Sequence, residues 1–143
     1  MDIVETASES LAHIDDSAAS IRPSPGKWSK KELIGHLLDS AVNNHHRFVR
    51  AQRIDNFVFP HYEQEHWVES QAYVERDWTE LIELWRLYNR HLAHVIRRVP
   101  ESSLSVTCKI GPYEPVSLNE LIDDYLIHLK HHLRQIGVGS SIE

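Results

Sequence analysis

The sequence predicts an all-α protein, a four-helix bundle in one domain that spans residues 1–143. Four segments repeat apolar residues at the three-to-four-residue spacing of an amphipathic helix. Three of these segments open with Ser or Asp followed three residues later by Glu, which is the pattern of a helix N-terminus. The composition of 41% hydrophobic and 25% charged residues, with only 5 Gly and 6 Pro, is typical of a folded domain rather than a disordered chain.

The first two helices are separated by a stretch that contains Pro and Gly. A loose apolar stripe predicts a helix over residues 4–20, which ends before the helix-breaking residues 22–26. Ser29 and Glu32 then form a capping box, in which each side chain accepts a hydrogen bond from the backbone amide of the other residue. The apolar stripe that follows continues to about Arg53 and predicts the second helix.

Residues 54–76 are aromatic and irregular, and we expect an ordered connection with one short helix near residues 63–73. A connection of this length is uncommon in a compact domain and is often functional. Asp77 and Glu80 cap the third helix, which carries apolar residues at helical spacing until Pro100 ends it.

A small hairpin and the last helix complete the chain. Residues 104–108 alternate apolar and polar side chains and Gly111 follows, which predicts a β-hairpin before the last helix. Ser117 and Glu120 form a further capping box, and Gly137 is a suitable end of the helix. The apolar stripe between these signals predicts the fourth helix of the bundle.

Eleven histidines are many for a chain of this length, and three of them share a pattern typical of a metal site. His128 and His132 lie one helical turn apart on one face, so both can offer a nitrogen to the same ion. His36 lies at the edge of the core-facing stripe of the second helix. Bundles build metal sites from facing helices, and three His with an open position is the ligand set of a catalytic zinc. The alternative is that these are solvated or hydrogen-bonded histidines without a metal.

His131 also lies within reach of His128, but helical geometry separates it from His132. At 3.6 residues per turn, His131 lies about 60° to one side of His128, and His132 lies about 40° to the other. Leu129 and Leu133 belong to the apolar stripe, and His132 lies beside them, whereas His131 lies on the polar arc. We therefore expect His132 at the interior site and His131 in solvent.

The other histidines are weaker candidates. Those on the second and third helices are interpreted as solvated or hydrogen-bonded, and those in the connection could border a pocket. The two groups are His45, His46, His91 and His94, and His61 and His66.

Five polar or aromatic residues are candidates for supporting the metal ligands or binding a substrate. They are Asp39, Asn43, Arg47, Tyr62 and Trp67. Asn43 follows His36 by about two helical turns on the same face, and Arg47 follows one turn further on. The Arg47 guanidinium matches a carboxylate, such as that of a thiol cofactor, although a salt bridge to a Glu is an equally supported alternative. The aromatic side chains either form the wall of a pocket or fill the core.

Several stretches share their order and spacing with one known family. They are Trp28-Ser29, Gly35 through Ser40, Asn43-Asn44 and Arg47-Phe48 in the second helix, Tyr62, Glu63 and 65–67 in the connection, and Tyr125 through Ile136 in the last helix. In these stretches the chain resembles the DinB-like proteins, and in particular their YfiT type. The resemblance covers residues 22–138 and implies a four-helix bundle, often dimeric, that binds zinc or nickel near one end. It implies that His36, His128 and His132 are the metal ligands. One departure is Gln135, where some members carry a further His that is not a ligand.

The resemblance also implies an activity, because YfiT-type proteins are described as metal-dependent hydrolases and as bacillithiol S-transferases. Three neutral imidazoles leave the ion dipositive, so a water or an incoming thiol in the fourth position has a lowered pKa. We therefore expect a metal-dependent enzyme, and the resemblance favours transfer of a low-molecular-weight thiol to an electrophile. The alternatives are a metal-dependent hydrolase and a non-catalytic, metal-binding bundle of the stress response.

Charge and composition exclude several other classes. The net charge of −6 and the absence of five consecutive Lys or Arg argue against nucleic acid or a membrane surface as a partner. No apolar stretch approaches about 18 residues and the acidic N-terminus does not resemble a signal peptide, so we expect a cytoplasmic protein. Cys108 is the single cysteine, which excludes an internal disulfide. Apolar residues beyond the needs of one bundle interior, among them Trp85, Phe48 and the aromatics of 57–73, predict a homodimer.

Overall fold

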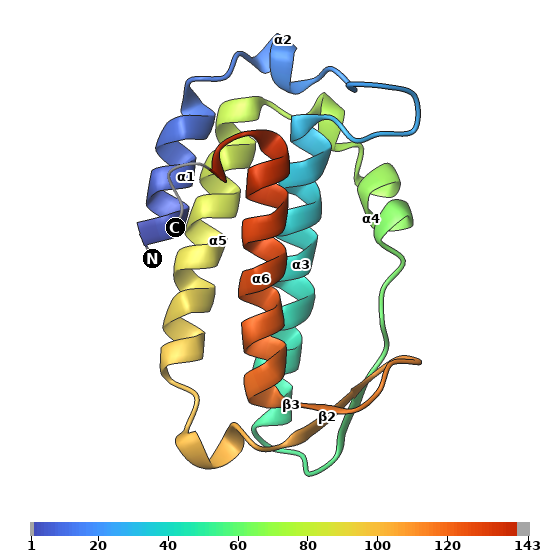
Figure 1. Cartoon of the computed structure of the whole chain (residues 1–143), viewed down its shortest axis with the longest axis vertical. Coiled ribbons are helices and arrows are strands. Elements are labelled where there is room, and N and C mark those ends of the chain that lie inside the picture. Colours follow the sequence, from blue (N-terminus) through green and yellow to red (C-terminus); the bar gives the residue numbers. More distant parts are fainter. Residues whose placement is uncertain (1, 140–143) are drawn as a thin grey trace.

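Four long helices run side by side along the long axis of the molecule (Figure 1). The computed structural model describes residues 2–139, and in them the bundle consists of α1 (Asp2–Ala12), α3 (Lys30–Ala51), α5 (Trp78–Arg97) and α6 (Leu118–Ile136). Helix α3 packs against both α5 and α6, and α1 packs against α5. The predicted fold class, a four-helix bundle, is therefore confirmed.

The N-terminal segment forms two helices, so the single helix predicted over residues 4–20 is wrong. Helix α1 is followed by α2 (Asp16–Ala19), and the backbone between them is extended at Asp15, with φ −65° and ψ 146°. The break places the Asp16 carboxylate where it accepts a hydrogen bond from the backbone amide of Trp78 at 2.9 Å. The chain does not continue as one helix here, because the Asp16 side chain instead stabilises the first turn of α5.

The predicted N-terminal caps of α3, α5 and α6 are all present. The Ser29 hydroxyl accepts from the Glu32 amide at 3.2 Å, and the Glu32 carboxylate accepts from the Ser29 amide at 2.9 Å. Ser117 and Glu120 form the same reciprocal pair at the start of α6, and the Asp77 carboxylate caps α5. These caps fix where each bundle helix begins, and therefore which turns of α3 and α6 face each other.

Short elements fill the connections between the bundle helices. They are β1 (Phe57–Phe59), α4 (Gln64–Gln71), η1 (Tyr73–Glu75), η2 (Glu101–Ser103), β2 (Thr107–Ile110) and β3 (Val116–Ser117), where η marks a 3₁₀ helix. Strand β2 pairs antiparallel with β3, as the predicted hairpin requires, and pairs in parallel with β1. The sequence did not predict β1, which holds the long connection against one end of the bundle (Figure 1).

The core uses the apolar residues that were expected at a dimer interface. Trp85 and Phe48 are both 0% exposed, and Phe57 is 2% exposed. They complete the interior of one chain, so their assignment to a surplus apolar surface is wrong, and the homodimer stays a prediction. Among residues 2–139, no helix combines the length and apolar composition needed to cross a membrane.

Candidate metal centre

Three histidine side chains converge between α3 and α6. His36 comes from α3, and His128 and His132 come from successive turns of α6. One ring nitrogen from each lies within 4.8 Å of the other two. The closest approach joins Nε2 of His36 to Nε2 of His128, at 3.0 Å. The structure therefore brings together the three residues that helical spacing selects.

Burial differs among the three rings. His36 is 1% exposed, and its ring centroid lies 4.9 Å from that of Trp28 and 4.8 Å from that of His132. His128 and His132 are half-buried, whereas His131 is exposed, as the helical angles predict. Trp28 could not be assigned to the site from the sequence, because a Trp directly before a helix cap is ordinarily a packing residue.

The histidine triad, which consists of His36, His128 and His132, is neutral at physiological pH. Burial, reinforced by the neighbouring imidazoles, lowers the pKa of His36 to about 3. Burial also lowers the pKa of His128 to about 4, and it lowers the pKa of His132. A neutral imidazole keeps a nitrogen lone pair, which is the form that binds a metal.

Gln135 orients the ring of His132. Its Oε1 lies 2.9 Å from Nδ1 of His132, and an amide oxygen only accepts, so Nδ1 of His132 donates. The lone pair of His132 is then on Nε2, the remaining ring nitrogen. Nδ1 of His36 and Nδ1 of His128 are buried and have no hydrogen-bond partner among residues 2–139. The spacing of three residues between His132 and Gln135 could have indicated this contact from the sequence.

The donor set fits a divalent transition-metal ion. Zinc binds imidazole nitrogen at about 2.0–2.1 Å, so two ligands of a tetrahedral ion lie roughly 3.3 Å apart. The 3.0 Å between the Nε2 atoms of His36 and His128 is close to that value. Imidazole nitrogen suits both zinc and nickel, and three protein donors leave at least one coordination position for another ligand.

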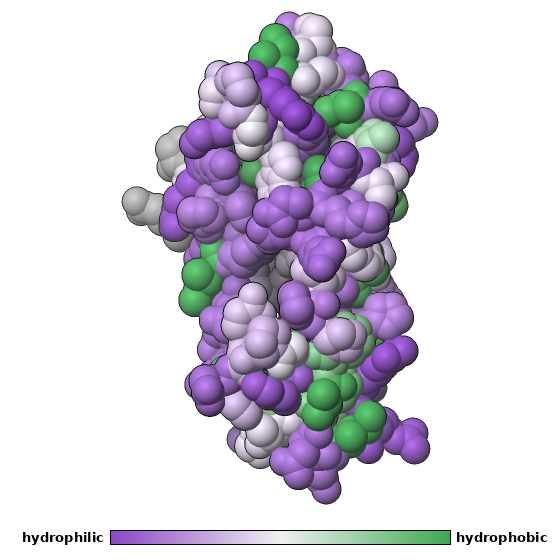
Figure 2. Space-filling view, turned by 90° about the vertical axis from the view of Figure 1, so that its right-hand side faces the viewer, coloured by the Kyte–Doolittle hydropathy of each residue, from purple (hydrophilic) through white to green (hydrophobic). Residues whose placement is uncertain are grey.

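A cavity of about 320 Å³ lies beside the triad, between α3, α6 and the sheet. His128 forms part of its wall, together with Tyr125 from α6, Arg47 from α3 and Tyr62 from the connection. The face that carries α4 and this connection is mostly hydrophilic and is hollowed near the middle of its height (Figure 2). A volume of this size is sufficient for a small organic molecule.

A sequence profile matches residues 4–136, which include all three histidines and nearly the whole chain. The profile describes the DinB superfamily. The chain belongs to the DinB superfamily. The YfiT-type resemblance is consistent with this assignment. A sequence relative and two solved structures are also similar to this chain.

One relative of this DinB-superfamily chain comes from Oceanobacillus iheyensis and carries the name "putative metal-dependent hydrolase". It is 28% identical over 111 residues, which cover 78% of the chain and 64% of the relative. The chain thus spans less than two thirds of that relative's length.

Solved structures share the DinB-superfamily fold. YfiT from Bacillus subtilis, described as a probable metal-dependent hydrolase with an unusual four-helix bundle topology, superposes with a TM-score of 0.84 at 18% identity, over 98% of this chain and 81% of YfiT. A mycothiol-dependent maleylpyruvate isomerase superposes with a TM-score of 0.75 at 16% identity, over 94% of this chain and 56% of the isomerase. At these identities the likeness shows the fold alone, and the YfiT-type fold implied by the sequence is confirmed.

Four of the five further residues predicted near the site line cavities. Arg47 and Tyr62 line the cavity that His128 borders. Asn43 and Trp67 line a second cavity, of about 440 Å³, which Tyr62 also borders. Tyr62 and Trp67 contact each other, with ring centroids 5.5 Å apart. The structure therefore brings Arg47 and Tyr62 to the side of the triad, and places Asn43 and Trp67 one cavity away.

Asp39, the fifth residue, binds the connection instead of a cavity. It is 1% exposed, and its Oδ1 accepts from the Tyr73 hydroxyl at 2.5 Å and from the Gln71 side-chain amide at 2.8 Å. Burial raises the pKa of Asp39, against the opposite effect of these two hydrogen bonds. Asp39 therefore holds the segment between α4 and α5 against α3.

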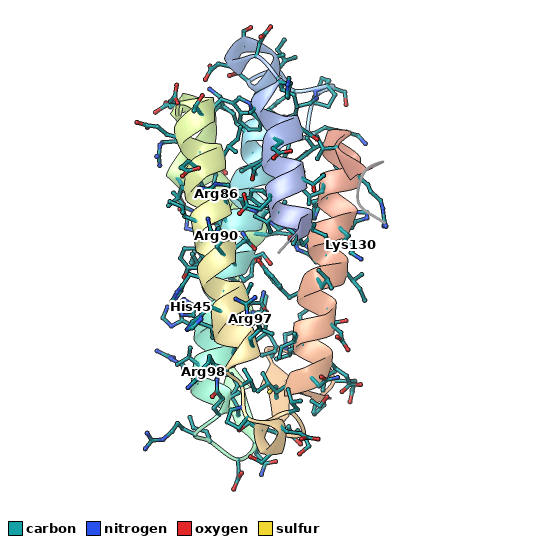
Figure 3. The ribbon with its side chains drawn as sticks, turned by 90° about the vertical axis from the view of Figure 1, so that its left-hand side faces the viewer. His45, Arg86, Arg90, Arg97, Arg98 and Lys130 are labelled. Carbon is teal, nitrogen blue, oxygen red and sulfur yellow. The ribbon has the colours of Figure 1, made fainter. Side chains whose placement is uncertain are left out.

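Two other histidines of this DinB-superfamily chain, His45 and His91, lie at the contact of α3 with α5. Nδ1 of His45 is hydrogen-bonded to the Tyr88 hydroxyl at 2.7 Å, and the His45 ring lies 5.3 Å from that of His91. His45 is accordingly seen beside α5 when the molecule is viewed from the α1 and α5 side (Figure 3). In the connection, His61 borders both cavities and His66 borders the second.

Proposed function

We propose that this protein is a metal-dependent enzyme whose divalent ion, zinc or nickel, is bound by His36, His128 and His132. The observation that carries the proposal is the convergence of three imidazoles, one of which, that of His128, lines a cavity of about 320 Å³. A structural zinc is enclosed by four protein ligands, whereas a catalytic zinc keeps a position for water or substrate. Three protein donors, with His128 in the wall of a cavity, match the second arrangement.

A bound divalent ion supplies Lewis acidity, which lowers the pKa of a thiol or water placed against it. The chain's own residues prepare the site for this chemistry. Gln135 holds His132 with its Nε2 lone pair available, and Trp28 helps to enclose the ring of His36. The cavity holds the organic part of the substrate against the aromatic rings of Tyr62 and Tyr125.

For the reaction we favour transfer of a low-molecular-weight thiol to an electrophile. The thiolate sulfur forms a bond to the electrophilic carbon, the leaving group departs with its bonding electrons, and the thiol proton passes to solvent. The mycothiol-dependent isomerase supports this choice, because it pairs the same fold with a thiol-dependent reaction. Hydrolysis is the second candidate, supported by the names of the Oceanobacillus relative and of YfiT.

The proposal includes a small-molecule substrate, a cytoplasmic location and a homodimer, as expected from the sequence. Light scattering of the purified protein at tens of micromolar tests the assembly. A mass of two chains supports the homodimer, and a mass of one chain contradicts it.

The activity is tested with untagged protein, loaded with zinc or nickel or treated with a chelator. Cysteine with 1-chloro-2,4-dinitrobenzene reports S-transfer, and 4-nitrophenyl acetate reports hydrolysis. Metal-dependent conjugation that is lost in His36→Ala and kept in His131→Ala supports thiol transfer. Metal-dependent ester cleavage with the same pattern supports hydrolysis instead. Rates equal to those of the chelated protein in both assays contradict an enzyme acting on these two substrate classes.

A further inference from the structure

One buried charge beside the triad has no hydrogen-bond or ion-pair partner among the residues that the structure describes. Arg47 is 8% exposed, and its Nε is buried without a hydrogen-bond partner among residues 2–139. None of the ion pairs within these residues includes Arg47. The alternative expected from the sequence, a salt bridge from Arg47 to a Glu, is therefore wrong for the described part of the chain.

Aromatic rings compensate only part of the cost of burying this cation. Cζ of Arg47 lies 5.5 Å from the ring centroid of Phe59 and 5.9 Å from that of Tyr62. A cation–π contact recovers only a fraction of the free energy that burial of an ion costs. Burial lowers the pKa of Arg47, but a guanidinium stays protonated in proteins. The positive charge therefore persists in the cavity wall.

The position of Arg47 on α3 relates it to the triad. Arg47 follows His36 by eleven residues, which is three helical turns to within about 20°, so both lie on one face of α3 at a separation of about 16 Å along the axis. Across the cavity, His128 of α6 lines the same space as Arg47. A molecule in this cavity can thus approach the triad with one end and Arg47 with the other.

The charges in the cavity wall limit the charge of such a molecule. Among the described residues that line the cavity, Arg47 is the one Arg or Lys, and Asp124 and Glu114 are acidic. A second negative charge beside Arg47 would meet these carboxylates and no further Arg or Lys. A single carboxylate is therefore favoured over a doubly charged phosphate, and its two oxygens match the planar guanidinium.

We propose that Arg47 binds a carboxylate of the substrate, and that the substrate extends from there along the cavity toward His128. This inference deepens the proposed function, because it names the substrate class of the same site as small molecules with one carboxylate. Carboxylate binding by Arg47 depends on the cavity, however, and not on the identity of the metal. Arg47 is then a substrate-binding residue whose charge is compensated when the ligand is bound.

A binding role and a structural role predict opposite effects on stability. If Arg47 held the fold together, its replacement would lower the melting temperature. If it is a binding residue, removal of an unpaired buried cation leaves the melting temperature unchanged or raises it. Arg50 provides a matched control, because it lies on the same helix and over the same Phe59 ring at 5.6 Å, but is exposed.

The test uses the full chain, after chelation and again with zinc, and two probes without a thiol, N-acetylleucine and its neutral amide N-acetylleucinamide. Affinities are measured by NMR titration, and melting temperatures by calorimetry. We expect the acid to bind roughly tenfold more tightly than the amide, as a charge-assisted pair implies. Arg47→Gln should abolish this preference without lowering the melting temperature, and Arg50→Gln should keep it.

Three results would overturn the proposal. They are equal or undetectable binding of acid and amide by the wild type, an equal loss of preference in Arg50→Gln, and a lowered melting temperature in Arg47→Gln. The measurement on chelated protein tests carboxylate binding by Arg47 independently of metal binding by the triad. A carboxylate preference in chelated protein stands even if no metal binds, and metal binding stands even if there is no preference.

Discussion

Nε2 of His36 lies 3.0 Å from Nε2 of His128, although ninety-two residues separate the two in the sequence. Each histidine lies at a fixed distance from a capping box, seven residues after Ser29 on α3 and eleven residues after Ser117 on α6. Because these boxes fix where α3 and α6 begin, they also fix the turns at which the two rings meet. The site is thus a consequence of helix ends and helix packing.

The first prediction distinguishes the adjacent histidines of α6. His132 belongs to the triad, whereas His131 is exposed. His132→Ala should abolish stoichiometric metal binding, because only two nitrogen donors remain, whereas His131→Ala should leave it nearly unchanged. Zinc affinity is measured by competition with a chelator. Equal losses in both variants, or a larger loss in His131→Ala, would disprove the assignment.

The second prediction concerns the contact from Gln135 to His132. Gln135→Leu removes the acceptor for Nδ1 of His132, so the ring loses its preferred tautomer and orientation. We expect zinc affinity to fall by about 10–100-fold, the usual effect of losing such a partner. Gln135→Glu keeps an acceptor and should keep the affinity. The contact has no role in metal binding if Gln135→Leu binds zinc as tightly as the wild type.

The third prediction is a pH dependence of stability in the chelated protein. The pKa values of His36 and His128 are about 3 and about 4 in the folded state, below the ordinary value of 6.5 that applies when unfolded. The unfolded chain therefore binds more protons between these values, so this stability is complete above pH 6.5 and is lost as the pH falls toward 4. Each of the two groups contributes up to about 3 kcal/mol over that range.

Urea unfolding at pH 7.5 and at pH 4.5 measures this effect, with His36→Leu and His131→Leu compared with the wild type. His36→Leu should lose much of the difference between the two pH values, and His131→Leu should keep it. An identical pH dependence in the wild type and in His36→Leu would show that the triad is not its source.

The fourth prediction concerns a close approach one residue before His36. A Cβ added at Gly35 would lie 2.1 Å from Cδ2 of Tyr73, and that ring is buried with its hydroxyl bound to Asp39. Gly→Ala inside a helix ordinarily stabilises by about 1 kcal/mol, but here we expect Gly35→Ala to destabilise by about 1–3 kcal/mol. Thermal unfolding checks this, and in a Tyr73→Ala background the same change should become stabilising. A stabilised Gly35→Ala single variant would contradict the close approach.

Local patterns in the sequence were sufficient for the bundle helices and for the two triad histidines of α6, whereas His36 was selected by its core-edge position and by the family resemblance. The three caps depend on residues three apart, and the pairing of His128 with His132 depends on residues four apart. The strand β1 could not be predicted, since it has three residues and pairs with β2, about fifty residues away. The break before α2 was missed for the same reason, because the Asp16 carboxylate binds Trp78, sixty-two residues further on.

The surroundings of the triad were predicted only in part. Arg47 and Tyr62 border the cavity, and for Arg47 the spacing of three helical turns after His36 places it on the same face of α3. Their roles as substrate-binding residues stay predictions. Asp39 also lies on α3, but its partner Tyr73 comes from the connection, whose path has no periodic signal. The sequence could not show that this carboxylate is bound elsewhere.

The metal site is tested by elemental analysis of untagged protein that has been reconstituted with zinc or nickel and freed of excess metal. We predict one ion per chain, held by His36, His128 and His132. Protein that retains no stoichiometric metal under these conditions would contradict this prediction.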